Sequence, residues 1–129
     1  MRYCKYGLAL IAFTSTAAFA ETIQCSLDSW SGASDPLVTV SWIGTKFEID
    51  TDDSTLRIGN ENGWRDPLPI DDVKTNSRFT AYIAYREEKT TKGETYKVRF
   101  AYRVYNDGRA QAGMTQPRFV PLKGTGTCS

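Results

Sequence analysis

A strict alternation of side-chain types near the C-terminal end constrains the fold of this chain most. From Tyr96 to Tyr105, aromatic and apolar residues occupy every second position, and basic residues occupy three of the positions between them. This period of two is typical of a β-strand with one buried face. Residues 78–86 alternate in the same way, and the polar stretch between the two segments contains Gly93. Together they predict a β-hairpin.

The register of this hairpin follows from the same alternation. To place both apolar sets on one side, Ile83 must face Phe100 and Tyr85 must face Val98. A slip by one residue would move one whole apolar set to the solvent side, so we predict this register.

Six further strands are predicted from β-branched and aromatic runs that are bounded by turn residues. They cover residues 22–27, 37–43, 46–50, 55–58, 109–115 and 117–123. The connection over residues 60–77 is longer than is usual for a loop with neither function nor secondary structure, so residues 68–73 could form one more strand. About eight strands with frequent turn signals predict an all-β domain, either a small antiparallel barrel or a barrel-like sandwich.

The first 20 residues have the pattern of a signal peptide. Arg2 and Lys5 precede an apolar run over residues 7–18, and Ala18-Phe19-Ala20 is a small-x-small cleavage site. The apolar run is too short for a spanning helix, and no cysteine stands where a lipid anchor would require one. We therefore expect a periplasmic or secreted protein without a membrane anchor, whose single domain covers residues 21–129.

Two cysteines remain after cleavage, at opposite ends of the mature chain. Cys25 and Cys128 lie 103 positions apart. In an oxidising compartment such a pair predicts one disulfide that joins the first strand to the last, which favours a closed barrel. A loop of this length contributes about 4.7 kcal/mol as an upper value.

Composition excludes several classes of enzyme. The chain has no histidine, so Ser-His-Asp, Cys-His and His-ligated metal chemistry are excluded. The remaining candidates are carboxylates on the long connection, Asp66, Asp71 and Asp72, which could serve a small hydrolase. Because neighbours on a strand point to opposite faces, Asp71 and Asp72 should not cooperate. We expect no enzyme and no cofactor.

A short acidic run resembles part of a calcium loop. Asp50, Asp52, Ser54 and Glu61 fall at ligand positions of that pattern, but Thr55 stands where the sharp turn requires glycine. We expect a solvated acidic turn and no metal.

Charge is distributed unevenly along the chain. Residues 21–72 carry 11 acidic and 3 basic side chains, whereas residues 73–129 carry 4 acidic and 11 basic ones. One interpretation is that acidic and basic strands are neighbours and pair across the sheet. The other is a basic face, on which the predicted register places Tyr82, Arg99 and Arg103 together. The near-zero net charge and the compartment argue against nucleic acid.

Two tryptophans fall on the longest predicted loops. Trp30 and Trp64 could bind a ligand at the mouth of the barrel, or they could close its ends as part of the core.

The signal sequence, Cys25, the Asp107-Gly108 turn and the terminal Gly124-Thr125-Gly126-Thr127-Cys128 resemble small exported β-barrel proteins of Gram-negative bacteria. This resemblance implies a compartment and a barrel-like fold. In shape the chain is also similar to periplasmic inhibitors of c-type lysozyme, but Ser31-Gly32-Ala33-Ser34 departs from their Ser-Gly-x-x-Tyr loop, so no inhibitory residue is carried over.

The expected function is therefore that of an exported monomeric binding module. It would engage an envelope component or a protein partner through Trp30, Trp64, Tyr82, Arg99 and Arg103. The alternatives are a periplasmic inhibitor of a host or competitor hydrolase, and a carboxylate-dependent hydrolase.

Overall fold

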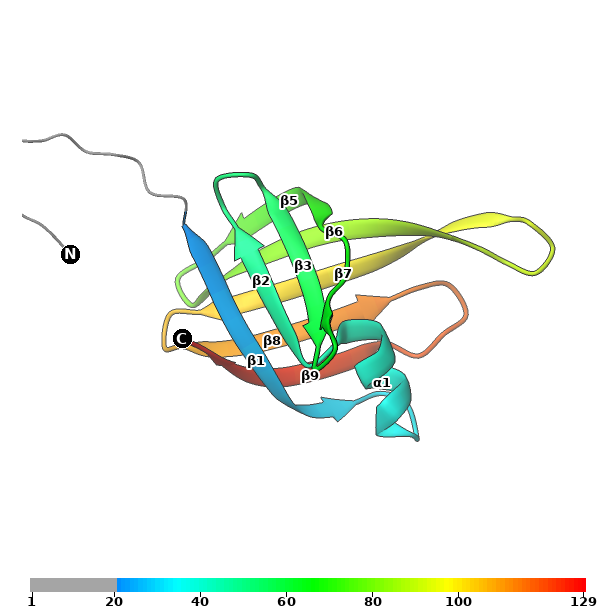
Figure 1. Ribbon diagram of the computed structural model, residues 1–129, viewed down its shortest axis with the longest axis horizontal. Coiled ribbons are helices and arrows are strands. Elements are labelled where there is room, and N and C mark those ends of the chain that lie inside the picture. Colours follow the sequence, from blue (N-terminus) through cyan, green and yellow to red (C-terminus); the bar gives the residue numbers. More distant parts are fainter. Residues whose placement is uncertain (1–20) are drawn as a thin grey trace, which may run out of the picture.

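The computed structural model describes residues 21–129, so the predicted signal peptide lies outside the described residues. The chain folds into a closed antiparallel barrel of eight strands, with one additional two-residue strand and one helix (Figure 1). The all-β barrel prediction is confirmed. The elements in chain order are β1 (Thr22–Ser31), α1 (Pro36–Ile43), β2 (Lys46–Asp50), β3 (Thr55–Asn60), β4 (Gly63–Trp64), β5 (Leu68–Thr75), β6 (Phe79–Lys89), β7 (Thr95–Tyr105), β8 (Arg109–Thr115) and β9 (Leu122–Cys128).

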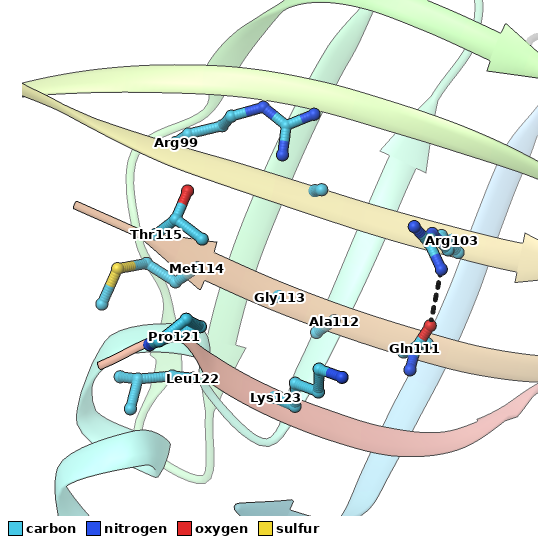
Figure 2. Close-up of a pocket in the computed structure, with 11 residues that line it drawn as sticks. Arg99, Arg103, Gln111, Ala112, Gly113, Met114, Thr115, Pro121, Leu122 and Lys123 are labelled. Atoms are coloured by element: carbon cyan, nitrogen blue, oxygen red, sulfur yellow. Dashed lines mark hydrogen bonds between the residues drawn. The ribbon is translucent and has the colours of Figure 1, made fainter. Parts of the chain in front are cut away.

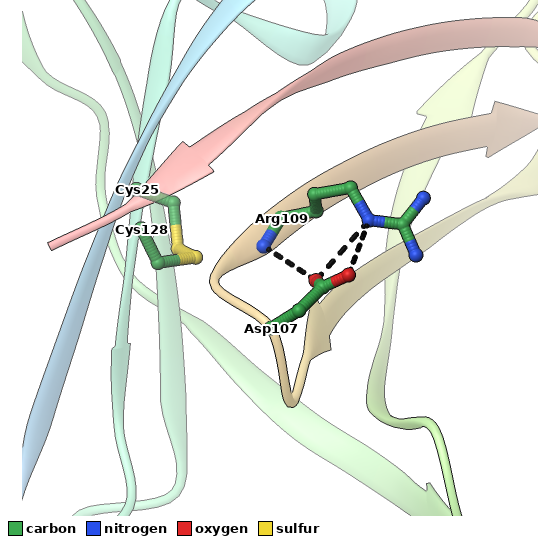
Figure 3. The surroundings of a disulfide bond; sticks show 4 residues. All are labelled: Cys25, Asp107, Arg109 and Cys128. Carbon is green, nitrogen blue, oxygen red and sulfur yellow. Dashed lines mark hydrogen bonds and ion pairs between the residues drawn. A yellow bond between two sulfur atoms is a disulfide. The ribbon is translucent and has the colours of Figure 1, made fainter.

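Pairing of the first strand with the last closes the barrel. The ladder runs β1-β2-β3-β5-β6-β7-β8-β9 and returns to β1, while β4 pairs only with β3. Cys25 lies directly opposite Cys128, and the two form the predicted disulfide. Figure 3 shows this bond beside the β7–β8 turn, where the Cys128 amide donates to the carbonyl of Gly108 (2.8 Å).

Aromatic side chains fill the barrel interior. Phe47, Phe100 and Tyr102 are completely buried, and the rings of Phe47 and Tyr102 meet edge to face with centroids 4.6 Å apart. The Tyr102 hydroxyl donates to the carbonyl oxygen of Ile43 (2.9 Å), so this completely buried hydroxyl has a hydrogen-bond partner. The interior is therefore a packed core.

The segment predicted as a strand over residues 37–43 is a helix instead. The carboxylate of Asp35 accepts from the amide of Leu37 (3.0 Å), and Pro36 occupies the first turn. Gly44 ends the helix at φ 78°, a conformation that favours glycine. These capping residues outweigh the β propensity of the segment, and α1 lies at one end of the barrel beside β1, β8 and β9 (Figure 1).

The predicted register of the β6–β7 hairpin is wrong by one residue. Ile83 pairs with Ala101 and Tyr85 with Arg99. The residues of β6 that face the interior beside Phe100 and Tyr102 are Ala84 and Tyr82. The physical reason is that Ala81, Tyr82, Ile83 and Ala84 are all buried, so both faces of β6 are apolar here and alternation does not determine the register.

Two other boundaries differ from expectation, and one strand that the sequence allowed is present. The last strand begins at Leu122 rather than at residue 117, because Pro117 and Pro121 cannot donate to a ladder. The strand allowed for residues 68–73 exists as β5. Trp30 lies within β1, which is longer than predicted, and not on a loop. Among the described residues, no helix is long and apolar enough to cross a membrane.

Candidate functional site

A shallow hollow lies on the outer face of the barrel, over β7, β8 and β9 (Figure 2). Its volume is about 180 Å³. The floor is formed by small residues, since Ala101 of β7 pairs with Gly113 of β8. Gly113 in turn pairs with Lys123 of β9. The rim is made of longer outward-facing side chains, namely Arg99, Arg103, Gln111, Thr115, Pro121 and Lys123. Met114 and Leu122, which also border the hollow, are buried in the core.

Three cationic side chains surround this floor. Arg99 and Arg103 stand on the same face of β7, four residues or about 13 Å apart along the strand. Lys123 reaches the hollow from β9, as Figure 2 shows. Within residues 21–129, no carboxylate lines the hollow and none forms an ion pair with any of the three. The hollow therefore carries uncompensated positive charge.

Arg103 is held in position by its neighbours. Its Nη1 donates to Oε1 of Gln111 (3.1 Å), which also accepts from the hydroxyl of Tyr105 (3.2 Å). The guanidinium lies 4.7 Å above the centroid of the Phe79 ring. A guanidinium oriented in this way loses little conformational entropy when it binds an anion.

Cation–ring pairs continue along the outer face of the sheet. Lys97 lies over the ring of Tyr85, and Arg109 lies over the ring of Tyr105. Because cations already cover these rings, this face offers N–H donors more than bare aromatic surface. Arg109 is paired with Asp107, which partly neutralises its charge.

Two of the five predicted binding residues, Arg99 and Arg103, come together at this hollow. Tyr82 does not join them, contrary to the predicted register, because it faces the interior opposite Tyr102 and is 9% exposed. Burial raises the pKa of the Tyr82 hydroxyl. Lys123, Ala101 and Gly113 were not predicted, since the registers of β7, β8 and β9 that bring them together cannot be derived from one sequence.

The two predicted tryptophans lie elsewhere. Trp30 is half-buried against the core, and its Nε1 donates to the carbonyl of Gly44 (3.0 Å). Trp64 lies on the outside of β3, where it is 37% exposed. Lys46 and Arg57 lie over its ring at 4.5 and 4.7 Å from the centroid. Neither tryptophan lines the hollow.

Among residues 21–129, no ion pair links the acidic part of the chain to the basic part. In the described residues, Glu48 pairs with Arg57 within the acidic part. The other two pairs, Arg86 with Glu88 and Arg109 with Asp107, lie within the basic part. These ion pairs therefore give no support to the interpretation that acidic and basic strands pair with one another across the sheet.

The candidate carboxylates are dispersed on the surface. Asp66, Asp71 and Asp72 are exposed, and a β-bulge at residue 71 interrupts the alternation of β5. Asp50 accepts from the amides of Asp52 and Asp53 and so caps its own turn. Across residues 21–129 no three metal-ligating side chains gather.

Comparison with protein-family models, with curated proteins and with solved structures finds no significant match to this chain.

Proposed function

We propose that this chain is an exported, non-catalytic binding module of the periplasm or cell envelope. It holds the anionic groups of an envelope component at the hollow on the outer face of β7, β8 and β9. The observation that supports this function best is the cluster of Arg99, Arg103 and Lys123, which has no carboxylate in the described lining. Guanidinium and ammonium groups bind carboxylates and phosphates through charge-assisted hydrogen bonds.

The shape of the site favours a polymer or a cluster of anions over a single small ion. The small floor residues allow a ligand to approach the sheet closely, while Arg99 and Arg103 are about 13 Å apart along β7. A single small anion could form strong hydrogen bonds with only one of two guanidinium groups placed this far apart. A glycan or glycolipid with two successive charged groups could place one group at each guanidinium.

The compartment supports the same proposal. The signal-peptide pattern over residues 1–20 predicts export, and the Cys25–Cys128 disulfide is a bond that persists in oxidising compartments. Glycans and glycolipids that carry carboxylate or phosphate groups are typical of the cell envelope.

The test is binding to immobilised lipopolysaccharide, polygalacturonate and neutral dextran. The wild type should bind both anionic polymers and not dextran, and raising the salt concentration should weaken binding because the site is exposed. The Arg99→Gln/Arg103→Gln/Lys123→Gln variant should bind at least about tenfold more weakly.

A matched control separates the hollow from net charge. Lys74→Gln/Lys89→Gln/Lys92→Gln removes three exposed positive charges, from β5 and from the tip of the β6–β7 hairpin, and none of these residues lines the hollow. This control should lose little affinity. Equal binding by wild type and the triple variant, or equal losses in the triple variant and the control, would contradict the proposal.

A further inference from the structure

A second cavity opens where the barrel wall is interrupted between β3 and β6. The pairing of β5 with β6 begins only at Ile70 and Ala84, so residues 65–67 cross this gap. The cavity measures about 220 Å³ and is lined by Ile58, Arg65, Asp66, Leu68 and Arg86. That volume is roughly the share of seven water molecules in the liquid.

Arg65 brings to this cavity a guanidinium that forms no ion pair within residues 21–129. Its Nη1 donates to the carbonyl of Trp42 (2.8 Å) and its Nη2 to the carbonyl of Ser41 (2.6 Å), so it caps the C-terminal end of α1. Both partners are neutral, and within the described chain no carboxylate forms an ion pair with Arg65. Burial lowers the pKa of this guanidinium, and the positive charge of Arg86 lowers it further.

Arg86 provides a second guanidinium on the inner side of β6. It lies 5.4 Å from the centroid of the Trp42 ring and 5.3 Å from that of Phe100. Its Nε donates to Glu88 (2.6 Å), which leaves the terminal nitrogens available on the cavity side. Two half-buried guanidinium groups therefore converge on one small cavity.

The remaining lining defines the ligand more closely. Ile58 and Leu68 supply an apolar wall, which suits a hydrocarbon body. Asp66 at the rim and Glu88 on Arg86 limit the net positive charge, which disfavours a dianion such as phosphate. We infer that this cavity binds a small organic monocarboxylate with a short apolar body, whose carboxylate lies between Arg65 and Arg86. The site is separate from the hollow of the proposed function.

Hexanoate is a suitable probe, because its carboxylate and short chain match the two kinds of lining. In ¹H–¹⁵N spectra of the mature wild-type protein, each of the three tryptophan indole N–H groups can serve as a reporter. Hexanoate should shift the indole signal of Trp42 saturably, at about millimolar concentration, because Arg86 stacks on that ring. The indole signals of Trp30 and Trp64 should stay in place, because Trp30 donates to Gly44 and Trp64 is covered by Lys46 and Arg57 rather than by Arg86.

Controls separate this site from general effects. Hexan-1-ol and inorganic phosphate should leave the Trp42 signal unmoved. Arg86→Gln should weaken hexanoate binding at least about tenfold, whereas Lys123→Gln, in the outer hollow, should not. Should Arg86→Gln fail to fold, the wild-type indole signals alone decide. The inference would be overturned if hexanoate did not shift the Trp42 signal, or if hexan-1-ol shifted it equally. A shift confined to the backbone amide of Gly113, in the outer hollow, would also overturn it.

Discussion

At the scale of single residues, the terminal Gly-x-Gly-x-Cys pattern has a steric cause. A Cβ on Gly126 would collide with the carbonyl oxygen of Ser26 on β1. A Cβ on Gly124 would lie 2.8 Å from the Cδ1 of Ile43, at the end of α1. The two glycines thus allow β9 to approach β1 and α1 closely. The same closeness brings Cys128 opposite Cys25.

We predict that Gly126→Ala destabilises the protein by about 1–3 kcal/mol or more, because the colliding atom belongs to the backbone and cannot rotate away. Gly113→Ala is the matched control, since its Cβ would come no closer than 3.7 Å to a neighbour. Urea denaturation of both variants measures the difference. Equal midpoints would refute this account of β9.

The two tryptophans should respond differently to truncation. Trp30→Ala removes a ring packed on the core and a hydrogen bond to Gly44, so we expect a loss of about 3–5 kcal/mol. Trp64→Ala removes an exposed ring that interacts with Lys46 and Arg57, so the loss should be about 1–2 kcal/mol. Thermal or urea unfolding compares them. A larger loss for Trp64→Ala would show that its ring is a core element.

At the scale of elements, the sequence predicted the barrel, the β6–β7 hairpin and the disulfide correctly. Alternation is a local signal, and Cys25 and Cys128 are the two cysteines left after the predicted cleavage. It did not predict α1, since the capping by Asp35, Pro36 and Gly44 competed with a β-branched segment. It did not predict the β6–β7 register, because β6 is apolar on both faces. Lys123 at the hollow depends on the β8–β9 register, which only the folded sheet defines.

The first three strands carry a polar network with a predicted pH response. Glu48 of β2 accepts hydrogen bonds from Gln24 of β1 (2.7 Å) and from Arg57 of β3. These bonds hold the pKa of Glu48 below its ordinary value of 4.5. A lowered pKa in the folded state stabilises the protein above that ordinary value, and the contribution is lost as the pH falls through the folded-state pKa.

Glu48→Gln should therefore reduce stability at pH 7 and flatten the acid side of the stability profile. Urea unfolding between pH 7 and pH 2 measures this, with Glu61→Gln, an exposed residue outside the network, as the control. An unchanged acid slope in Glu48→Gln would contradict the role given to this network.

At the scale of the whole molecule, a single seam between β1 and β9 closes the barrel. The β1–β9 ladder closes the barrel with backbone hydrogen bonds, and the disulfide fixes the same seam.

The ion pairs of the described residues stay within the acidic part or within the basic part of the chain. The barrel therefore presents a basic side over β7, β8 and β9 that is not neutralised by its own acidic strands.

Removal of the disulfide should lower stability without abolishing the fold. Cys25→Ser/Cys128→Ser releases a closure of 103 positions, whose chain-entropy contribution is at most about 4.7 kcal/mol. The β1–β9 ladder should still form. Urea denaturation should show a lower midpoint with native-like β circular dichroism in water, and an unchanged midpoint would exclude a stabilising role for the bond.

An NMR titration with trigalacturonate tests whether the hollow over β7, β8 and β9 binds anionic groups. We expect the largest amide shifts at Ala101 and Gly113 on the floor, and high salt should suppress them. Trigalacturonate offers the successive carboxylates that Arg99 and Arg103 are spaced to meet. Absence of shifts, or shifts centred on another part of the barrel, would contradict the claim.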